Sequence, residues 1–349
     1  MNQRPTKLSM RGNRSEPRHQ PRRDRPQCSR AELRRGSAKL LLVLALFLLG
    51  GIGIWIGRAG AGTSGSSSGS LDLTWGKRGV ADGRLQKPRA AAIDENDRIY
   101  IVDKLARIQV FDTDGNLLLG PIRTPESKFG KPTGLTIDPD GNLMVADTHY
   151  YRILYYSPEG KLLEDRTLGG KKGQGPGEFG LVTDAVVDSA GNTYVCEYGD
   201  FDRVQKFSPE GKFITQWGGH GEAPGQFRRP QNMTIDEQDR LWVVDACNHR
   251  VQVFDTEGKL LKMWGTPGTE PGQLSYPYDI VLADDIVYIC EYGNHRVQKF
   301  TREGKSLGCW GGAGHGEGEL HNPWALVRDS QERLHVIDTN HHRVQRVLF

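Results

Sequence analysis

Three sets of residues recur at fixed positions along the chain, and their side chains are of kinds that bind ligands or metals. An acid precedes an arginine by four to six positions six times, at Asp103, Asp147, Glu197, Asp245, Glu291 and Asp338. A histidine stands directly before that arginine three times, at His249, His295 and His342. A third position varies between repeats and holds Arg89, Thr133, Thr183, Gln231, Tyr278 and Trp324. The three sets suit a cation, a transition metal and an organic ligand respectively.

The first two sets also have simpler structural interpretations. Because an acid and an arginine recur together, we expect an ion pair across each hairpin rather than an acidic ring around a cation. Zinc or copper needs imidazoles within a few ångströms of each other, whereas adjacent repeats spread His249, His295 and His342 along an arc. We therefore expect these histidines to pack their loops, with His149 and His341 as irregular extras. The sequence predicts no metal site and no cofactor.

The variable set is the candidate ligand site. A position that serves only the scaffold should look alike in every repeat, and this one changes from arginine to threonine to aromatic. With neighbouring loop residues it predicts a binding mouth formed by Arg89, Asp184, Tyr198, Gln231, Asn232, Tyr278, Asp279, Tyr292 and Trp324. Aromatic rings, amides, carboxylates and a guanidinium suit a sugar or an extended peptide. The alternative, that these side chains are varied and solvated loop tips, stays open.

Short strands must position all three sets. Leu241–Val244 and Val251–Phe254 are rich in β-branched and aromatic residues on either side of Ala246–His249, which predicts a hairpin. Asn232–Ile235 and Lys259–Trp264 add a first and a fourth strand to this repeat. The closing arginines, Arg107, Arg152, Arg203, Arg250, Arg296 and Arg343, are 45, 51, 47, 46 and 47 residues apart. Six such repeats predict one closed all-β domain, a six-bladed β-propeller of four-stranded blades.

The two ends of the repeat region predict how the ring closes. The last repeat stops at Phe349, after its third strand, and Leu71–Gly76 resembles the fourth strand of the other repeats. We expect Leu71–Gly76 to complete the last blade, which removes an open sheet edge. Strand alternation then gathers the long connections between repeats and the loops between second and third strands on one side, the long-loop face. Function concentrates on long loops over a rigid scaffold, so the mouth is expected there.

The recurring motifs resemble those of NHL-repeat proteins. They run Pro-x-x-apolar-x-apolar-Asp, then Val-x-Asp, then Asn-His-Arg-Val-Gln-x-Phe, then Gly-Lys and Trp-Gly, within residues 71–349. The resemblance implies a six-bladed propeller that serves as a platform for protein, RNA or small ligands. We expect a binding platform for a protein, peptide or glycan.

One enzymatic branch that the repeats resemble is the peptidyl-hydroxyglycine amidating lyase, in which zinc-binding histidines follow the first-strand proline. The corresponding positions here are the variable set named above, and none of them is histidine. The resemblance therefore does not extend to that zinc site, because a catalytic zinc takes three protein ligands. The alternative function is an exported lyase or hydrolase that uses the propeller mouth.

The residues before the repeats predict where the protein lies. Residues 1–39 hold 12 Lys and Arg without apolar periodicity and are expected to form a basic, disordered tail. Leu40–Gly57 is an uncharged apolar run of 18 residues, long enough for one transmembrane helix. The positive-inside rule places the tail in the cytoplasm and the propeller outside it, linked by the Gly/Ser-rich residues 58–70. An uncleaved signal anchor is favoured, and cleavage near Ala59–Ala61 is the alternative.

Charge separates the tail from the repeats. Of the 46 Lys and Arg and 43 Asp and Glu, residues 1–70 hold 13 and 3, which leaves 33 and 40 for residues 71–349. The repeat region is thus net acidic. A net acidic, exported propeller disfavours a nucleic-acid partner.

Overall fold

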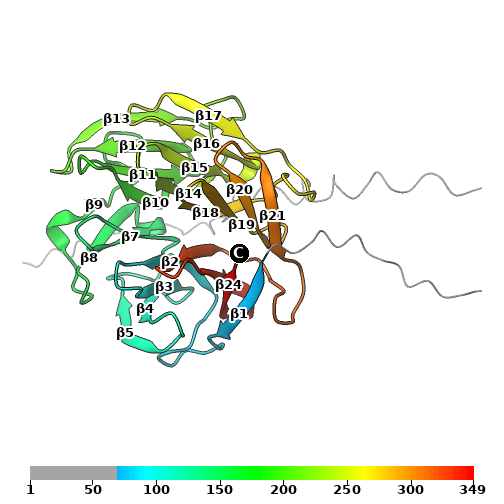
Figure 1. Cartoon of the computed structure of the whole chain (residues 1–349). Coiled ribbons are helices and arrows are strands. Elements are labelled where there is room, and N and C mark those ends of the chain that lie inside the picture. Colours follow the sequence, from blue (N-terminus) through cyan, green and yellow to red (C-terminus); the bar gives the residue numbers. More distant parts are fainter. Residues whose placement is uncertain (1–68) are drawn as a thin grey trace, which may run out of the picture. The chain divides into compact units, whose positions relative to one another are not determined.

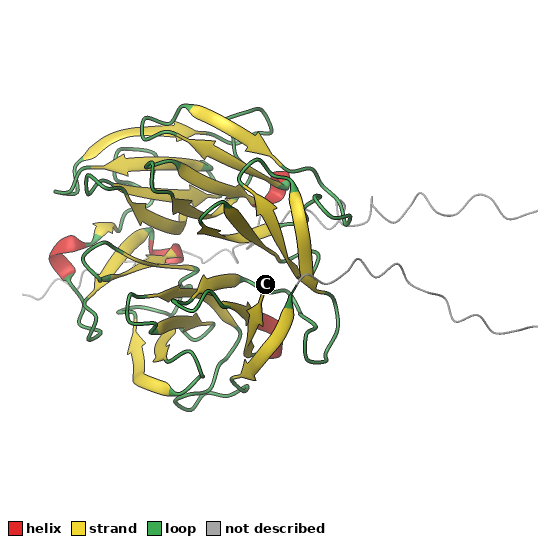
Figure 2. Cartoon of the chain, viewed as in Figure 1, coloured by secondary structure: helices red, strands yellow, loops and turns green. Residues whose placement is uncertain are grey.

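The computed structural model describes residues 69–349, and these form a ring of six four-stranded antiparallel sheets (Figure 1, Figure 2). The first three blades comprise β2 (Pro88–Ile93), β3 (Ile99–Asp103), β4 (Arg107–Phe111), β5 (Leu117–Arg123); β6 (Gly134–Ile137), β7 (Leu143–Asp147), β8 (Arg152–Tyr156), β9 (Leu168–Gly169); and β10 (Leu181–Val187), β11 (Thr193–Tyr198), β12 (Arg203–Phe207), β13 (Phe213–Gly218). The predicted all-β, six-bladed propeller with four-stranded blades is confirmed.

The remaining blades repeat the same order. They comprise β14 (Pro230–Ile235), β15 (Leu241–Asp245), β16 (Arg250–Phe254), β17 (Leu260–Trp264); β18 (Pro277–Ala283), β19 (Ile286–Glu291), β20 (Arg296–Thr301), β21 (Ser306–Gly311); and β22 (Ala325–Arg328), β23 (Leu334–Asp338), β24 (Arg343–Leu348) with β1 (Ser70–Trp75). Short 3-10 helices lie in four loops: η1 (Thr148–Tyr150), η2 (Glu164–Arg166), η3 (Ala246–Asn248) and η4 (Thr339–His341). The strands of the fourth blade match the predicted ones to within two residues.

The ring is closed by its first strand. β1 pairs antiparallel with β24, with Leu71 opposite Val347 and Trp75 opposite Val344; the two strands lie side by side in Figure 1, blue against red. Trp75 is buried between residues of the sixth blade and of the first, and its ring lies 5.1 Å from that of Phe111. The predicted closure by the N-terminal strand is therefore confirmed.

Apolar side chains fill the spaces between blades. Six buried clusters occur, and each joins two neighbouring sheets. The middle strands are buried on both faces because each blade packs against a neighbour on either side. The outermost strand β13 alternates between partly buried and exposed positions instead. In blade one β5 continues to Arg123, and Ile122 packs on the core between blades one and two.

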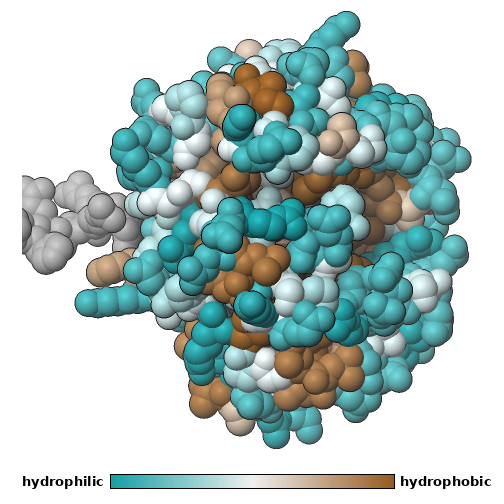
Figure 3. Space-filling model, turned by 90° about the vertical axis from the view of Figure 1, so that its left-hand side faces the viewer, coloured by the Kyte–Doolittle hydropathy of each residue, from teal (hydrophilic) through white to brown (hydrophobic). Residues whose placement is uncertain are grey.

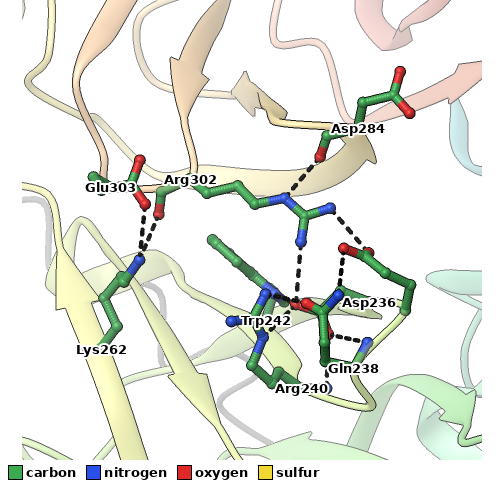
Figure 4. A network of polar contacts seen from close by, with 9 residues as sticks. Asp236, Gln238, Arg240, Trp242, Lys262, Asp284, Arg302 and Glu303 are labelled. Atoms are coloured by element: carbon green, nitrogen blue, oxygen red, sulfur yellow. Dashed lines mark hydrogen bonds and ion pairs between the residues drawn. The ribbon is translucent and has the colours of Figure 1, made fainter.

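Polar bridges between blades reinforce the face opposite the long loops. In blade four the Asp236 carboxylate accepts hydrogen bonds from the main chain of its own turn and from the Trp242 indole at 2.8 Å. Arg302 reaches over from blade five to Asp236 and to Glu237, the latter at 2.9 Å (Figure 4). The surface seen in Figure 3 is largely hydrophilic, with apolar residues in separate patches.

Within residues 69–349, no helix has the length and hydropathy to cross a membrane. The predicted cytoplasmic tail, the anchor at Leu40–Gly57 and almost all of the linker lie outside the described residues.

Candidate functional site

Each of the six repeats contains the predicted ion pair between its acid and its arginine. The pairs are Asp103–Arg107 at 2.6 Å, Asp147–Arg152 at 2.9 Å, Glu197–Arg203 at 2.7 Å, Asp245–Arg250 at 2.8 Å, Glu291–Arg296 at 2.6 Å and Asp338–Arg343 at 2.8 Å. All six carboxylates are buried. The acidic set therefore has partners within the scaffold, as the structural interpretation expected.

The arginines also hold the long connections between blades. Arg250 donates to the carbonyl oxygens of Glu222, Ala223 and Gln226 at 2.7–3.0 Å. Arg203 and Arg296 make the corresponding bonds in blades three and five. In each of five connections one apolar residue is also fully buried; these residues are Leu85, Phe179, Phe227, Leu274 and Leu320. The loops of the long-loop face are thus fixed to the blades at two points.

The repeated histidines join neighbouring blades. His249, His295 and His342 have positive φ angles of 55–60°. Their Nδ1 atoms accept hydrogen bonds from the backbone N–H groups of Tyr276, Asn322 and Lys87 at 3.1, 2.9 and 2.8 Å. Each acceptor lies in one blade and each donor at the start of the next, so His342 also helps to close the ring. The predicted loop-packing role of these histidines is confirmed.

Aromatic residues of blades five and six form a cluster at the mouth. The rings of Tyr278 and Tyr292 stack with centroids 4.4 Å apart, and Trp324 meets them edge-on at 4.9 and 5.8 Å. The Arg89 guanidinium lies 5.5 Å from the Trp324 ring. Trp324, Tyr292 and Arg89 are partly exposed, whereas Tyr278 is buried. The structure therefore brings together these four predicted residues from blades one, five and six.

Arg229 links this cluster to the other side of the mouth. Its guanidinium lies 5.1 Å from the Tyr198 ring and 5.3 Å from the Tyr278 ring, and its Nε donates to Gln231 at 3.1 Å. The pKa of Arg229 is raised: burial alone would lower it, and the surrounding tyrosines outweigh that effect. Arg229 was not among the residues predicted from the sequence, although its place directly before the first-strand residue Pro230 was a signal for a residue on the mouth.

A small pocket lies at the centre of the ring. The pocket there is lined by Arg89, Gln231, Asn232, Tyr278, Asp279 and Trp324, with small residues beside them, and it leaves about 10 Å³. That volume holds about one water molecule. This pocket is therefore too small for an organic ligand.

Two of the predicted residues, Asp184 and Asp279, point their carboxylates at the scaffold. Asp184 accepts hydrogen bonds from Met233 N–H at 3.0 Å and from the Thr136 hydroxyl at 3.1 Å. Asp279 accepts from Leu326 N–H at 2.7 Å. Burial raises the pKa of Asp184 to about 7 and that of Asp279 well above its usual range, because the main-chain donors only partly offset the loss of water. Both carboxylates fasten one blade to the next.

Three further histidines converge at the edge of blade six. His315 and His321 lie in the connection between β21 and β22, and His341 lies in η4. One ring nitrogen of each lies within 4.8 Å of the other two. From the sequence, His341 was expected to be an irregular extra, and this group was not predicted. The signal available in the sequence was the local density of histidines, since five of the ten fall within residues 315–342.

The fold and the repeat together define the class of protein. The chain is a six-bladed β-propeller that contains NHL repeats: residues 227–254 and 274–300 match the family model described as "NHL repeat".

Curated relatives share part of this sequence. Peptidylglycine alpha-amidating monooxygenase of Rattus norvegicus is 30% identical over 189 residues, which cover 51% of this chain and 18% of that protein. NHL repeat-containing protein 3 of Homo sapiens is 30% identical over 175 residues, 46% of this chain and 49% of that protein. The chain thus spans about a fifth of the first relative and about half of the second.

Solved structures share the fold at low identity. A streptogramin B lyase superimposes with a TM-score of 0.56 at 12% identity and covers 78% of this chain and 95% of its own. An auxiliary nutrient binding protein from Bacteroides thetaiotaomicron gives a TM-score of 0.59 at 12% identity and covers 76% and 69%. At these identities the likeness concerns the fold alone.

Asp184 makes the stability of the propeller depend on pH. Its pKa is about 7 in the folded chain and near 4 when unfolded, so the folded state holds one more proton between these values. This contribution is fully present below pH 4 and is lost as the pH rises towards 7. In urea titrations at several pH values, the unfolding free energy of the wild type should fall relative to Asp184→Asn by about 1.4 kcal/mol per pH unit in that window. Asp82→Asn, at an exposed position, is the control; parallel profiles for the wild type and Asp184→Asn would contradict the assignment.

Proposed function

We propose that this chain is a membrane-tethered, extracytoplasmic NHL-repeat propeller that binds a protein, peptide or glycan at the mouth on its long-loop face. The observation that carries the proposal is the cluster of Tyr278, Tyr292 and Trp324 beside Arg89 and Arg229. The aromatic cluster departs from the scaffold residues that recur in every blade. The fold itself therefore does not require these side chains at their positions.

The geometry of the cluster favours a flat ligand surface. Partly exposed Trp324 and Tyr292 offer faces on which a sugar ring or a peptide plane packs. The Arg89 guanidinium lies over the Trp324 ring, and its N–H groups suit a carboxylate or a hydroxyl group of the same ligand. Because the pocket below leaves only about 10 Å³, we place the ligand across the rim, which suits an extended peptide or a glycan chain.

The alternative is an exported lyase or hydrolase that uses the mouth. The observation in its favour is the partial similarity to amidating monooxygenases. Against it, the positions that follow the first-strand prolines hold no histidine, and the two buried carboxylates near the centre bind main-chain groups. A binding role therefore explains more of the residues at the mouth than a catalytic role does.

Tyr292 and Tyr150 provide a matched pair for testing the mouth. Both are partly buried tyrosines in loops between second and third strands, but Tyr150 belongs to blade two. The full chain is first screened on glycan and peptide arrays. We expect Trp324→Ala and Tyr292→Ala to weaken the best ligand by 1–3 kcal/mol, or about 5- to 150-fold, as at binding hot spots. Calorimetry should show Tyr150→Ala to bind like the wild type. Equal losses of affinity in all three variants, or a lowered melting temperature with unchanged affinity in the Trp324 and Tyr292 variants, would place the site elsewhere.

The proposed location rests on charge. Twelve basic residues precede the apolar run at Leu40–Gly57, so the start of the chain should stay in the cytoplasm. A reporter enzyme that works only outside the cytoplasm, fused after Phe349, should be active. The same fusion with a cytoplasmic reporter should be silent, and activity of the cytoplasmic reporter would contradict the proposed topology.

A further inference from the structure

The three histidines at the edge of blade six are close enough to share one ion. His315 Nδ1 and His341 Nε2 are 3.0 Å apart, and the ring centroids of the three residues are 5.1–6.0 Å apart. Tetrahedral zinc with Zn–N bonds of about 2.0–2.1 Å places its ligand nitrogens roughly 3.3 Å from each other. The three ligand nitrogens lie within 4.8 Å of one another, so they must approach by at most about 1.5 Å, which side-chain rotation of the exposed His315 can supply.

The neighbouring blades show that the scaffold does not require these histidines. Relative to the first-strand proline, the positions of His315 and His321 hold Glu222 and Arg228 in blade four, and Thr269 and Ser275 in blade five. Two residues before the repeat arginine, Asn248 and Asn294 replace His341. Glu222 and Arg228 form an ion pair at 2.8 Å, so the same places are in contact there too. Blade six alone places imidazoles at all three of them among blades four to six.

The ion pair of blade six orients the group. One carboxylate oxygen of Asp338 accepts a hydrogen bond from the backbone N–H of His321 at 2.9 Å, and the other lies 2.8 Å from His341 Nδ1. Arg343 holds the loop of His315 by donating to the Gly316 carbonyl at 2.6 Å. A carboxylate behind a histidine ring is the usual second partner of a metal-binding imidazole, because it fixes the ring and directs the other nitrogen outwards. Here it leaves Nε2 of His341 facing His315.

We propose that His315, His321 and His341 form a binding site for a divalent transition metal, with zinc the best match to three imidazoles. Three protein ligands leave a fourth position open, and His315 is exposed, so water or a donor group from a bound partner completes the coordination. The site borders the aromatic cluster: His321 is followed by Asn322, whose side chain donates to the Tyr292 carbonyl at 3.0 Å. It goes beyond the proposed function, since metal binding does not depend on which ligand the mouth takes.

Zinc chloride and cobalt chloride are the probes, titrated into the tag-free full chain after treatment with a chelator. We expect one equivalent of zinc in calorimetry, and a cobalt complex with the strong visible absorption of four-coordinate geometry. The key variant combines His315→Glu, His321→Arg and His341→Asn, which installs the residues of blade four. Since that set already packs on an equivalent blade, the variant should keep the wild-type melting temperature without metal and lose at least about 100-fold in zinc affinity.

Two further variants make the result specific. His341→Ala alone should lower zinc affinity by a similar factor, because two imidazoles and waters remain. His220→Ala, in the corresponding connection before blade four, should bind zinc like the wild type. The proposal is overturned if the triple variant binds zinc as tightly as the wild type, or if the wild type takes up no zinc at micromolar concentrations. Ligand binding at the mouth is measured separately with Tyr292→Ala, so either proposal can fail without the other.

Discussion

The buried pair between the acid of one strand and the arginine of the next is the interaction on which the long-loop face depends. Burial raises the pKa of Asp245 to about 6 even though Arg250 lies 2.8 Å away. The cost of removing the carboxylate from water therefore offsets much of its attraction to the guanidinium. Such a pair adds little net stability, yet losing one partner typically costs about 3–5 kcal/mol. Its main effect is geometric: the guanidinium also binds carbonyl oxygens of the adjoining connection and fixes a loop that would otherwise be free.

Because the same scaffold of strands, ion pair and connection recurs in six blades, other side chains on it can change without altering the scaffold. Arg229, Trp324 and Tyr278 occupy positions that hold other residues in other blades, and they meet because neighbouring blades place their loops at one mouth. The histidines of blade six are a second departure on the same scaffold, oriented by Asp338 and Arg343. The aromatic cluster and the histidine group are thus neighbouring sets of side chains that the same scaffold of loops holds in place.

Much of the scaffold was predictable from the sequence because it repeats. Six arginines at regular spacing indicate six blades, and a last repeat without its fourth strand indicates closure by residues near Leu71. What does not repeat was harder to predict. The contact between His315 and His341 depends on how one connection folds over the next loop, and the burial of Asp184 depends on its neighbours on both sides. The membrane anchor lies outside the described residues and stays a prediction.

The central claim is that partners bind the long-loop face and not the opposite one. The most direct measurement is site-specific photo-crosslinking in the native host, with benzoylphenylalanine placed either at Tyr292, in the aromatic cluster, or at the exposed Glu210, in a turn of the opposite face. The account predicts a discrete crosslinked product from Tyr292, which an excess of the array-selected ligand suppresses, and none from Glu210. Products from Glu210 alone, or equal products from both positions, would contradict it.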